Sequence, residues 1–157
     1  MDVQVRRAEK SDAPAVAELA LRLVEQHVGY DPVRFARIAT LDGMTWFYGS
    51  QTEAETARVL VAEIDKRVVG FVYLEFENTN YAELSVFSTR LHDIYVDEGA
   101  RLHGAGRKLM EATVAEAREF GAAKILLSVA VKNTLARTFF QKAGFKETMV
   151  EMMLPLN

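Results

Sequence analysis

The sequence contains no cysteine. Disulfide bonds, thiolate nucleophiles and zinc sites built on cysteine are therefore excluded. The histidines are His27, His92 and His103, and their spacing fits none of the short metal-binding motifs. We therefore expect no metal site.

Long apolar runs and an excess of basic charge are also missing. No run approaches the ~20 residues that a membrane-spanning helix needs, and Asp2, Arg6 and Arg7 stand where a signal peptide would have its apolar core. The formal net charge is −3, whereas nucleic-acid binders usually carry a positive excess. We expect a cytoplasmic protein that binds neither membranes nor nucleic acid.

What remains is the composition of an ordinary globular protein. Hydrophobic residues make up 50% of the 157 positions and charged residues 26%, so the chain can bury one core of its own. The sequence shows no linker, internal repeat or low-complexity stretch. We therefore predict a single domain over residues 1–157.

The periodicity of apolar residues predicts the order of strands and helices. The predicted strands are residues 3–8, 58–64, 67–77, 89–96, 124–131 and 146–154. The predicted helices are residues 12–28, a short one in 31–39, 107–120 and 134–143. Residues 41–56 are predicted to be mainly loop with a helical turn near 52–56, and residues 78–85 a loop. A meander followed by alternating elements predicts an α/β or α+β fold with a mixed sheet.

A glycine cluster leads into the third of these helices, in the stretch ARLHGAGRKLMEATVAEA from residue 100 to 117. Glycine at Gly104 and Gly106 would let the unpaired N–H groups of a helix start approach an anion closely. The surrounding basic side chains are Arg101, His103, Arg107 and Lys108. A solvated basic turn is the alternative, but cations at a helix start cost about 0.3–1 kcal/mol unless an anion offsets them. The stretch therefore predicts an anion site.

Two familiar phosphate motifs do not fit this site. A nucleotide P-loop needs Lys and then Ser or Thr after its last glycine, which is absent. A dinucleotide fingerprint needs a third glycine where Leu109 stands.

Residues 96–106, VDEGARLHGAG, resemble the acetyl-CoA loop of the GNAT superfamily of N-acetyltransferases. Arg101, Gly104 and Gly106 occupy the positions of that family's signature. Residues 133–145, NTLARTFFQKAGF, resemble its closing helix. The resemblance implies a mixed, mostly antiparallel central sheet flanked by helices on both faces, with acetyl-CoA as co-substrate.

The resemblance also implies a set of cofactor-binding residues. The main chain of residues 94–96 would pair with the pantetheine arm like an added strand, and the N–H groups of residues 102–107 would hold the pyrophosphate. Residues of the closing helix would contact the pantetheine, its thiol end and the phosphates, although core packing is the alternative for its two phenylalanines. The implied set is Ile94, Tyr95, Val96, Arg101, Leu102, His103, Gly104, Ala105, Gly106, Arg107, Asn133, Phe139, Phe140 and Lys142.

The activity implied is acetyl transfer to a primary amine of a small molecule or peptide, by direct attack in a ternary complex. A general base must first remove the proton of the ammonium. His92 stands where several relatives carry a base, and imidazole titrates near neutral pH. Asp93 faces the opposite way in a regular strand, although a bulge would change this, and Glu75 is a weaker candidate. A half-buried His92 without a role is the alternative.

Phe140 stands where many relatives carry the tyrosine that protonates the leaving thiolate. This departure keeps a second hypothesis open, an acyl-CoA-binding sensor or partner module with little or no catalysis. Aromatic and acidic residues in the expected acceptor region suit an organic cation, although they suit an oligomer contact equally well. They are Tyr30, Asp31, Trp46, Phe47, Tyr48, Glu77, Tyr81, Glu83 and Phe87. Because dimers are common in the family, a homodimer is also among the expected partners.

Overall fold

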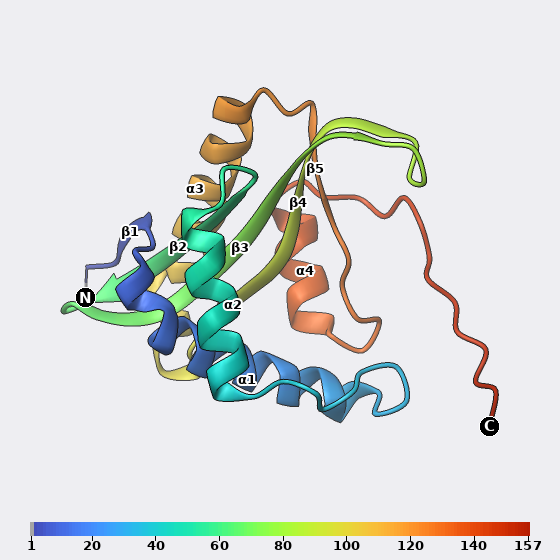
Figure 1. Ribbon diagram of the computed structural model, residues 1–157, viewed down its shortest axis with the longest axis horizontal. Helices are drawn as coiled ribbons and strands as arrows, with labels where there is room; N and C mark the ends of the chain where they lie inside the picture. Colours follow the sequence, from blue (N-terminus) through green and yellow to red (C-terminus); the bar gives the residue numbers. More distant parts are fainter. Residues whose placement is uncertain (1) are drawn as a thin grey trace.

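A computed structural model describes residues 2–157 and contains one five-stranded sheet (Figure 1). The strands are β1 (Gln4–Arg7), β2 (Ala57–Ile64), β3 (Arg67–Asn80), β4 (Ser85–Val96) and β5 (Lys124–Leu127). They lie in the order β1-β2-β3-β4-β5, with antiparallel pairing between the first four and parallel pairing of β5 to β4. The helices are the 3₁₀ turns η1 (Lys10–Asp12) and η2 (Glu98–His103) and the α-helices α1 (Ala13–Tyr30), α2 (Leu41–Glu53), α3 (Ala105–Phe120) and α4 (Thr134–Lys142).

Helices cover both faces of this sheet, and each face has its own apolar cluster. On one face, Val16 of α1 and Tyr48 of α2 pack against Phe71 of β3. On the other, Leu109 of α3 and Phe140 of α4 join a cluster that includes Leu74 of β3. The predicted fold class, a mixed and mostly antiparallel sheet between helices, is confirmed.

The prediction of a loop over residues 41–56 is wrong, because α2 occupies residues 41–53. Thr40 caps this helix by accepting a hydrogen bond from the N–H of Gly43 at 3.0 Å. Gly49 is buried, and a Cβ atom there would lie 3.6 Å from that of Ala13. The two glycines of this segment, Gly43 and Gly49, therefore belong to the first turn of the helix and to its contact with α1.

The short helix predicted in residues 31–39 does not form beyond a single turn. The carboxylate of Asp31 accepts hydrogen bonds from the N–H groups of Val33 and Arg34, as a helix cap would. The turn ends there because it has no apolar face to bury, since Val33 is 68% exposed and Ile38 87% exposed.

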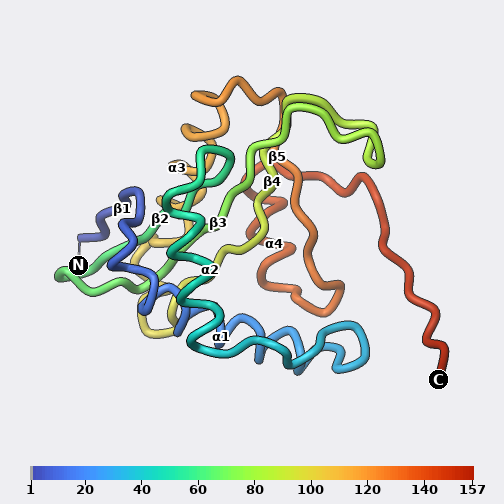
Figure 2. The backbone as a smooth tube through the Cα atoms, in the orientation of Figure 1, coloured from blue at the N-terminus to red at the C-terminus, as the bar shows by residue number. Residues whose placement is uncertain are grey.

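The ends of the sheet also differ from prediction. β3 continues to Asn80 and β4 begins at Ser85, so half of the loop predicted over residues 78–85 is strand and the two strands form a long hairpin. β5 stops at Leu127, four residues before the predicted end at Val131. The final strand predicted over residues 146–154 is wrong, because this segment is extended but belongs to no ladder of the described chain. Figure 2 shows it running away from α4 to the C-terminus.

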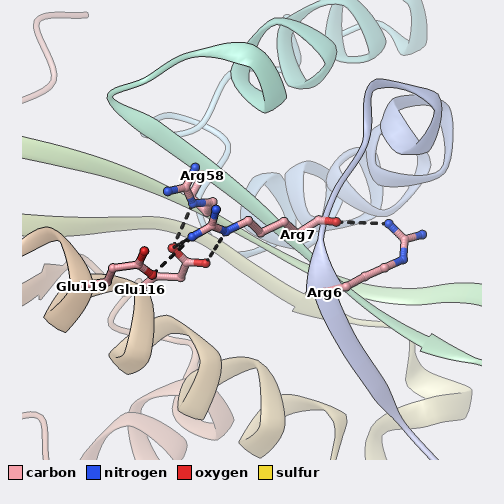
Figure 3. Close-up of polar contacts among 5 residues, drawn as sticks. All are labelled: Arg6, Arg7, Arg58, Glu116 and Glu119. Atoms are coloured by element: carbon pink, nitrogen blue, oxygen red, sulfur yellow. Dashed lines mark hydrogen bonds and ion pairs between the residues drawn. The ribbon is translucent and has the colours of Figure 1, made fainter.

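An ion-pair cluster ties α3 to the first two strands (Figure 3). The carboxylate of Glu116 on α3 accepts hydrogen bonds from Arg7 of β1 at 2.8 Å and from Arg58 of β2 at 2.9 Å. Glu119, one turn later, lies 3.3 Å from Arg7. Burial by itself raises the pKa of Glu116, but the hydrogen bonds from the two arginines outweigh it and lower that pKa.

Candidate functional site

The candidate site begins where β4 and β5 separate. β5 pairs with β4 only over residues 88–91, the last pair being Leu91 and Leu127. Beyond that point β4 continues to Val96 and pairs with β3 alone. Within residues 2–157 no strand occupies the other side of residues 92–96. The predicted main-chain segment Ile94–Val96 thus lies along a gap in the sheet, where an extended ligand can add as a strand would.

The start of α3 follows directly from the end of β4. The turn η2 carries the chain from Glu98 to His103, and Gly104 then adopts φ 79° and ψ 12°, a left-handed conformation that favours glycine. No side chain caps α3, and the first bond in the helical pattern runs from the N–H of Lys108 to the carbonyl of Gly104 at 3.1 Å. The N–H groups before Lys108 therefore have no partner within the helix, as an anion site requires.

The basic side chains near this helix start make contacts with the protein itself. Arg101 donates from Nε to the carbonyl oxygen of Val96 at 2.9 Å and lies over the ring of Tyr95. Arg107 pairs with Glu111 at 2.7 Å, one turn along α3, and Lys108 donates to the carbonyl of Val3 at 2.9 Å. Arg101 thus fixes the turn between β4 and α3, while Leu102 is almost fully exposed, His103 half-buried and Ala105 buried.

Helix α4 forms the far wall of the gap. Asn133 caps this helix, because its side-chain oxygen accepts a hydrogen bond from the N–H of Ala136 at 3.1 Å. The side-chain NH₂ group of Asn133 can then donate to a ligand. A Cβ atom at Gly106 would lie 3.4 Å from the ring of Phe139, so glycine lets α3 and α4 meet closely. Phe140 is 6% exposed and belongs to the core, whereas Lys142 is exposed in the last turn.

A β-bulge in β4 places both predicted catalytic residues on one face of the sheet. Tyr73 pairs with Asp93 but the next residue of β3, Leu74, pairs with Leu91, so His92 is the extra residue. The imidazole of His92 stacks on the ring of Tyr73, with the two ring centroids 5.2 Å apart. The carboxylate of Asp93 accepts a hydrogen bond from the hydroxyl of Tyr48 at 2.8 Å. Both tyrosines belong to the apolar cluster under α1 and α2. His92 and Asp93 therefore do not point to opposite faces of the sheet, as they would in a regular strand.

The third candidate base, Glu75, joins the same group. Nε2 of His92 lies 3.2 Å from Oε1 of Glu75, and the two side chains are 36% and 42% exposed. A carboxylate can only accept, so this contact assigns the proton to Nε2 and leaves Nδ1 as the basic nitrogen of neutral imidazole. The structure therefore brings His92, Asp93 and Glu75 together.

Burial is the main cause of the raised pKa values of the groups beneath His92. Burial raises the pKa of Asp93, although the hydrogen bond from Tyr48 and the proximity of His92 and His27 work in the other direction. The Asp93 carboxyl has many protein neighbours, yet part of the residue still reaches solvent. Burial and the nearby carboxylates of Glu75 and Asp93 also raise the pKa of Tyr73 to about 12, so both tyrosine hydroxyls stay protonated at neutral pH.

Sequence reasoning did not place three neighbours of Asp93 beside it. Tyr48 is named only among the acceptor-region residues, in a segment predicted to be loop, and no role is assigned to Tyr73 or His27. His27 is in fact half-buried, and its Nδ1 lies 2.8 Å from the carbonyl of Leu23, one turn earlier in α1. The only signal of such a cluster in the sequence is the presence of aromatic residues in these segments.

The residues expected around the acceptor do not gather in one pocket. Trp46 is 74% exposed, Glu77 and Glu83 both pair with Arg90, and Tyr81 lies at the tip of the β3–β4 hairpin. A cavity of about 740 Å³ lies instead between α1 and the end of β4, lined in part by Gln26, Tyr95 and Arg101.

Two further properties concern membranes and metals. In the part of the chain that the structure describes, no helix is both long and apolar enough to cross a bilayer. Over residues 2–157, no three histidine or acidic side chains converge in a way that could hold a metal ion.

A sheet that opens beside an uncapped helix start is the arrangement that a CoA-dependent acyltransferase needs to hold its cofactor. The model of the acetyltransferase (GNAT) family matches residues 22–145, and the chain therefore belongs to this family, whose members are N-acetyltransferases.

Curated relatives and solved structures agree with this assignment. An uncharacterized N-acetyltransferase of Bacillus subtilis is 26% identical over 92% of this chain and 91% of its own. An N-alpha-acetyltransferase of Sulfurisphaera tokodaii is 31% identical over 67% of this chain and 66% of its own. A mutant protein from Bacillus halodurans superposes with a TM-score of 0.86 at 22% identity, covering 98% of this chain and 99% of that one. An aminoglycoside N-acetyltransferase in complex with CoA gives 0.81 at 16% identity, covering 98% and 94%. At these identities the two structures establish the fold alone.

Proposed function

We propose that this chain transfers the acetyl group of acetyl-CoA to a primary amine of a small molecule or peptide, by direct attack in a ternary complex. The observation that carries the proposal is the gap between β4 and β5 beside the uncapped start of α3. Acetyl-CoA supplies the acetyl thioester when bound. The remaining steps depend on how this chain holds the cofactor and removes a proton from the amine.

The fit of the cofactor rests on main-chain groups. The segment Ile94–Val96 offers unpaired strand positions to the amide groups of a pantetheine arm, and Asn133 offers a side-chain donor from the opposite wall. The N–H groups of residues 102–107 and the dipole of α3 favour the pyrophosphate. Arg101 holds this turn in place, and Lys142 is free to approach the phosphates. His103, Arg107 and Phe139 complete the proposed cofactor site.

His92 is the proposed general base. A lysine-like amine with an ordinary pKa of about 10.4 is mostly protonated at pH 7, which adds roughly 4–5 kcal/mol to the barrier unless a base removes the proton. Glu75 accepts the Nε2 proton of His92, and Nδ1 then takes the proton of the amine. The amine nitrogen bonds to the acetyl carbonyl carbon as the bond to the CoA sulfur breaks, and CoA leaves as a thiolate that takes up the second amine proton through water. Asp93 and Tyr48 support the floor of this site, and the ionised form of Asp93 contributes negative potential that suits a cationic acceptor.

Phe140 favours the second candidate function, an acyl-CoA-binding module with little catalysis. It carries no hydroxyl and is packed in the core, so it cannot donate a proton to a thiolate. The proposal includes a primary amine as the acceptor, a cytoplasmic location and no binding of nucleic acid. Fractionation of expressing cells tests the location.

Cofactor binding is tested by calorimetry with a matched pair of glycine variants. Gly104→Asp should weaken acetyl-CoA binding about 100-fold or more, because a carboxylate would take the place of the anion. Gly121→Asp is the control, since Gly121 caps the other end of α3 with φ 90°, and a Cβ atom added there would meet no atom within 4 Å. Equal affinity in the two variants would remove the loop from the site.

Catalysis is tested separately by thiol release from acetyl-CoA across a panel of amines. Turnover that depends on both acetyl-CoA and a primary amine supports the transferase. Tight binding of acetyl-CoA without turnover on any amine would support the sensor instead.

A further inference from the structure

Tyr73 takes no part in the proposed proton transfer, although it lies directly against the proposed base. It belongs to β3 and to the apolar cluster under α1 and α2, where it is 7% exposed. Its ring stacks on the imidazole of His92 with an angle of 22° between the two planes. Near-parallel stacking of two aromatic rings is a favourable arrangement, so the buried ring favours one orientation of the exposed one.

The backbone around His92 gives its side chain little support. His92 is the extra residue of the bulge, and within residues 2–157 it is paired neither with β3 nor with β5. Its side chain is also partly exposed, so close packing does not surround it on every side. A side chain at such a position needs contacts of its own to keep one orientation.

Two contacts together orient the imidazole of His92. Glu75 accepts a hydrogen bond from Nε2 and so fixes one point of the ring, but a single hydrogen bond leaves the tilt of the ring about that point free. The stack on Tyr73 fixes the plane of the ring. With one point and the plane both set, the direction of Nδ1, which takes the proton of the amine, is set as well.

Tyr73 is itself held firmly enough to serve as a template. The rings of Phe47 and Tyr48, both of α2, meet it edge-on with centroids 5.5 Å and 5.9 Å away. Its hydroxyl donates a hydrogen bond to Oε1 of Gln51, also of α2, at 3.2 Å. A ring packed in this way has little freedom to rotate. The orientation of His92 is thus passed on from α2 through Tyr73.

The ring of Tyr73 also suits the charge that His92 acquires. When Nδ1 takes a proton the imidazole becomes a cation, and the face of an aromatic ring attracts a cation. Burial is the main cause that raises the pKa of Tyr73 to about 12, so its hydroxyl keeps its proton at neutral pH and does not compete for the proton of the amine. The stack therefore favours His92 after proton transfer as well as before it.

We propose that Tyr73 is a positioning residue, which holds the imidazole of His92 with Nδ1 directed toward the acceptor amine. This inference rests on the proposed acetyl transfer, because it concerns the base of that reaction. Reacting groups need to be held within roughly 0.5 Å of their productive geometry, and a misplacement of about 1 Å can lower a rate on the order of 100-fold. Loss of the ring should therefore lower kcat and leave the cofactor site unchanged.

Steady-state kinetics on two variants of Tyr73 provides the first test. Tyr73→Leu removes the flat ring, so kcat should fall at least ~tenfold while the KM for acetyl-CoA stays within about twofold. Tyr73→Phe keeps the ring and loses only the hydrogen bond to Gln51, so kcat should stay within about threefold of the wild-type value.

Phe71→Leu is the matched control. It removes a fully buried ring from the same cluster, two residues earlier in β3, and the ring of Phe71 stacks edge-on against Tyr48. This variant should lose stability as Tyr73→Leu does but keep its kcat. Equal losses of kcat in Phe71→Leu and Tyr73→Leu would mean that Tyr73 serves only the core, and would overturn the proposal.

Nuclear magnetic resonance tests the stack in the unmodified chain without any turnover. The chain has only three histidines, so the imidazole signals of His92 can be assigned by comparison with His92→Ala. Nuclear Overhauser contacts should join the ring protons of His92 and Tyr73, and the ring current should move the His92 signals upfield. Tyr73→Phe should keep this upfield shift and Tyr73→Leu should lose it. A His92 imidazole with no contact to Tyr73 would overturn the proposal even where Tyr73→Leu fails to fold.

The outcomes separate this inference from the proposed function. An unmodified chain that turns over no amine would refute acetyl transfer, and the positioning role would fall with it. Turnover by the unmodified chain, with kcat unchanged in Tyr73→Leu, would refute the positioning role alone.

Discussion

The two faces of the sheet bury different chemistry. Under α3 and α4, the apolar cluster contains no titratable side chain, and the charges that tie α3 to the strands lie at its rim. Under α1 and α2, the cluster contains Tyr48, Tyr73 and Tyr95. The Asp93 carboxyl accepts a hydrogen bond from the hydroxyl of Tyr48. The α3 face is therefore built for stability, whereas the α1/α2 face holds the polar groups that its proposed chemistry needs.

The largest effect expected on the stability side follows from Leu109→Ala. Leu109 is fully buried beneath α3, so the variant should lose about 2–5 kcal/mol of unfolding free energy in urea denaturation. Acetyl-CoA affinity of the folded fraction should change little. A loss below ~1 kcal/mol would show that this face is loosely packed and would break the comparison.

His92→Ala should show the reverse pattern. We expect turnover to fall about 100-fold and the acidic limb of the pH–rate profile to flatten, because the amine loses its base. Unfolding free energy should change by less than ~0.5 kcal/mol, since His92 is an exposed residue of a bulge. The comparison is His103→Ala, which removes the last residue of η2 from the proposed cofactor site and should not flatten the acidic limb. An unaltered pH profile would remove His92 from the mechanism and favour Asp93 or Glu75.

Asp93→Asn tests the cost of the polar face. Burial raises the pKa of Asp93, so the native state binds its proton more tightly than the unfolded chain does, and wild-type stability falls as pH rises from about 4 through that raised pKa. The amide of asparagine can still accept from Tyr48, but it does not ionise. The variant should therefore lose this slope and gain about 0.5–1 kcal/mol at pH 8. A variant less stable than wild type at pH 8 would contradict this account.

Glu116→Gln should give the opposite slope and an effect of similar size. The pKa of Glu116 is lowered in the native state, so its stabilisation is fully present above the ordinary value of about 4.3 and is lost as pH falls through the lowered value. The variant should lose about 1 kcal/mol at pH 7, and the difference should vanish in acid. Glu119→Gln is the control, because Glu119 is 72% exposed and should contribute almost nothing. Equal losses in both variants would mean that the cluster acts only through net charge.

The parts of the fold that sequence predicted are those whose signal is local. Asp65 and Lys66 both adopt positive φ in the turn predicted between β2 and β3, and Gly121 ends α3 as expected. The start of α3 is also where the glycine cluster placed it, within two residues.

The parts that sequence did not predict depend on contacts between distant residues. Gly49 reads as a helix breaker until Ala13 is seen against it. The bulge at His92 depends on the register of β4 against β3, which no single strand reveals. Residues 146–154 have the composition of a strand, but in the described chain they pair with no strand, and composition alone does not show whether a partner is found.

The bulge at His92 also separates the two halves of β4. Between Ser88 and Leu91 the strand is fastened on both edges, while from His92 onward it is fastened on one. Because His92 and Asp93 lie at and beyond the bulge, their orientation follows from the pairing of residues 93–96 with β3. A change in the length of the β3–β4 hairpin on the other side of the bulge can therefore leave these two side chains where they are.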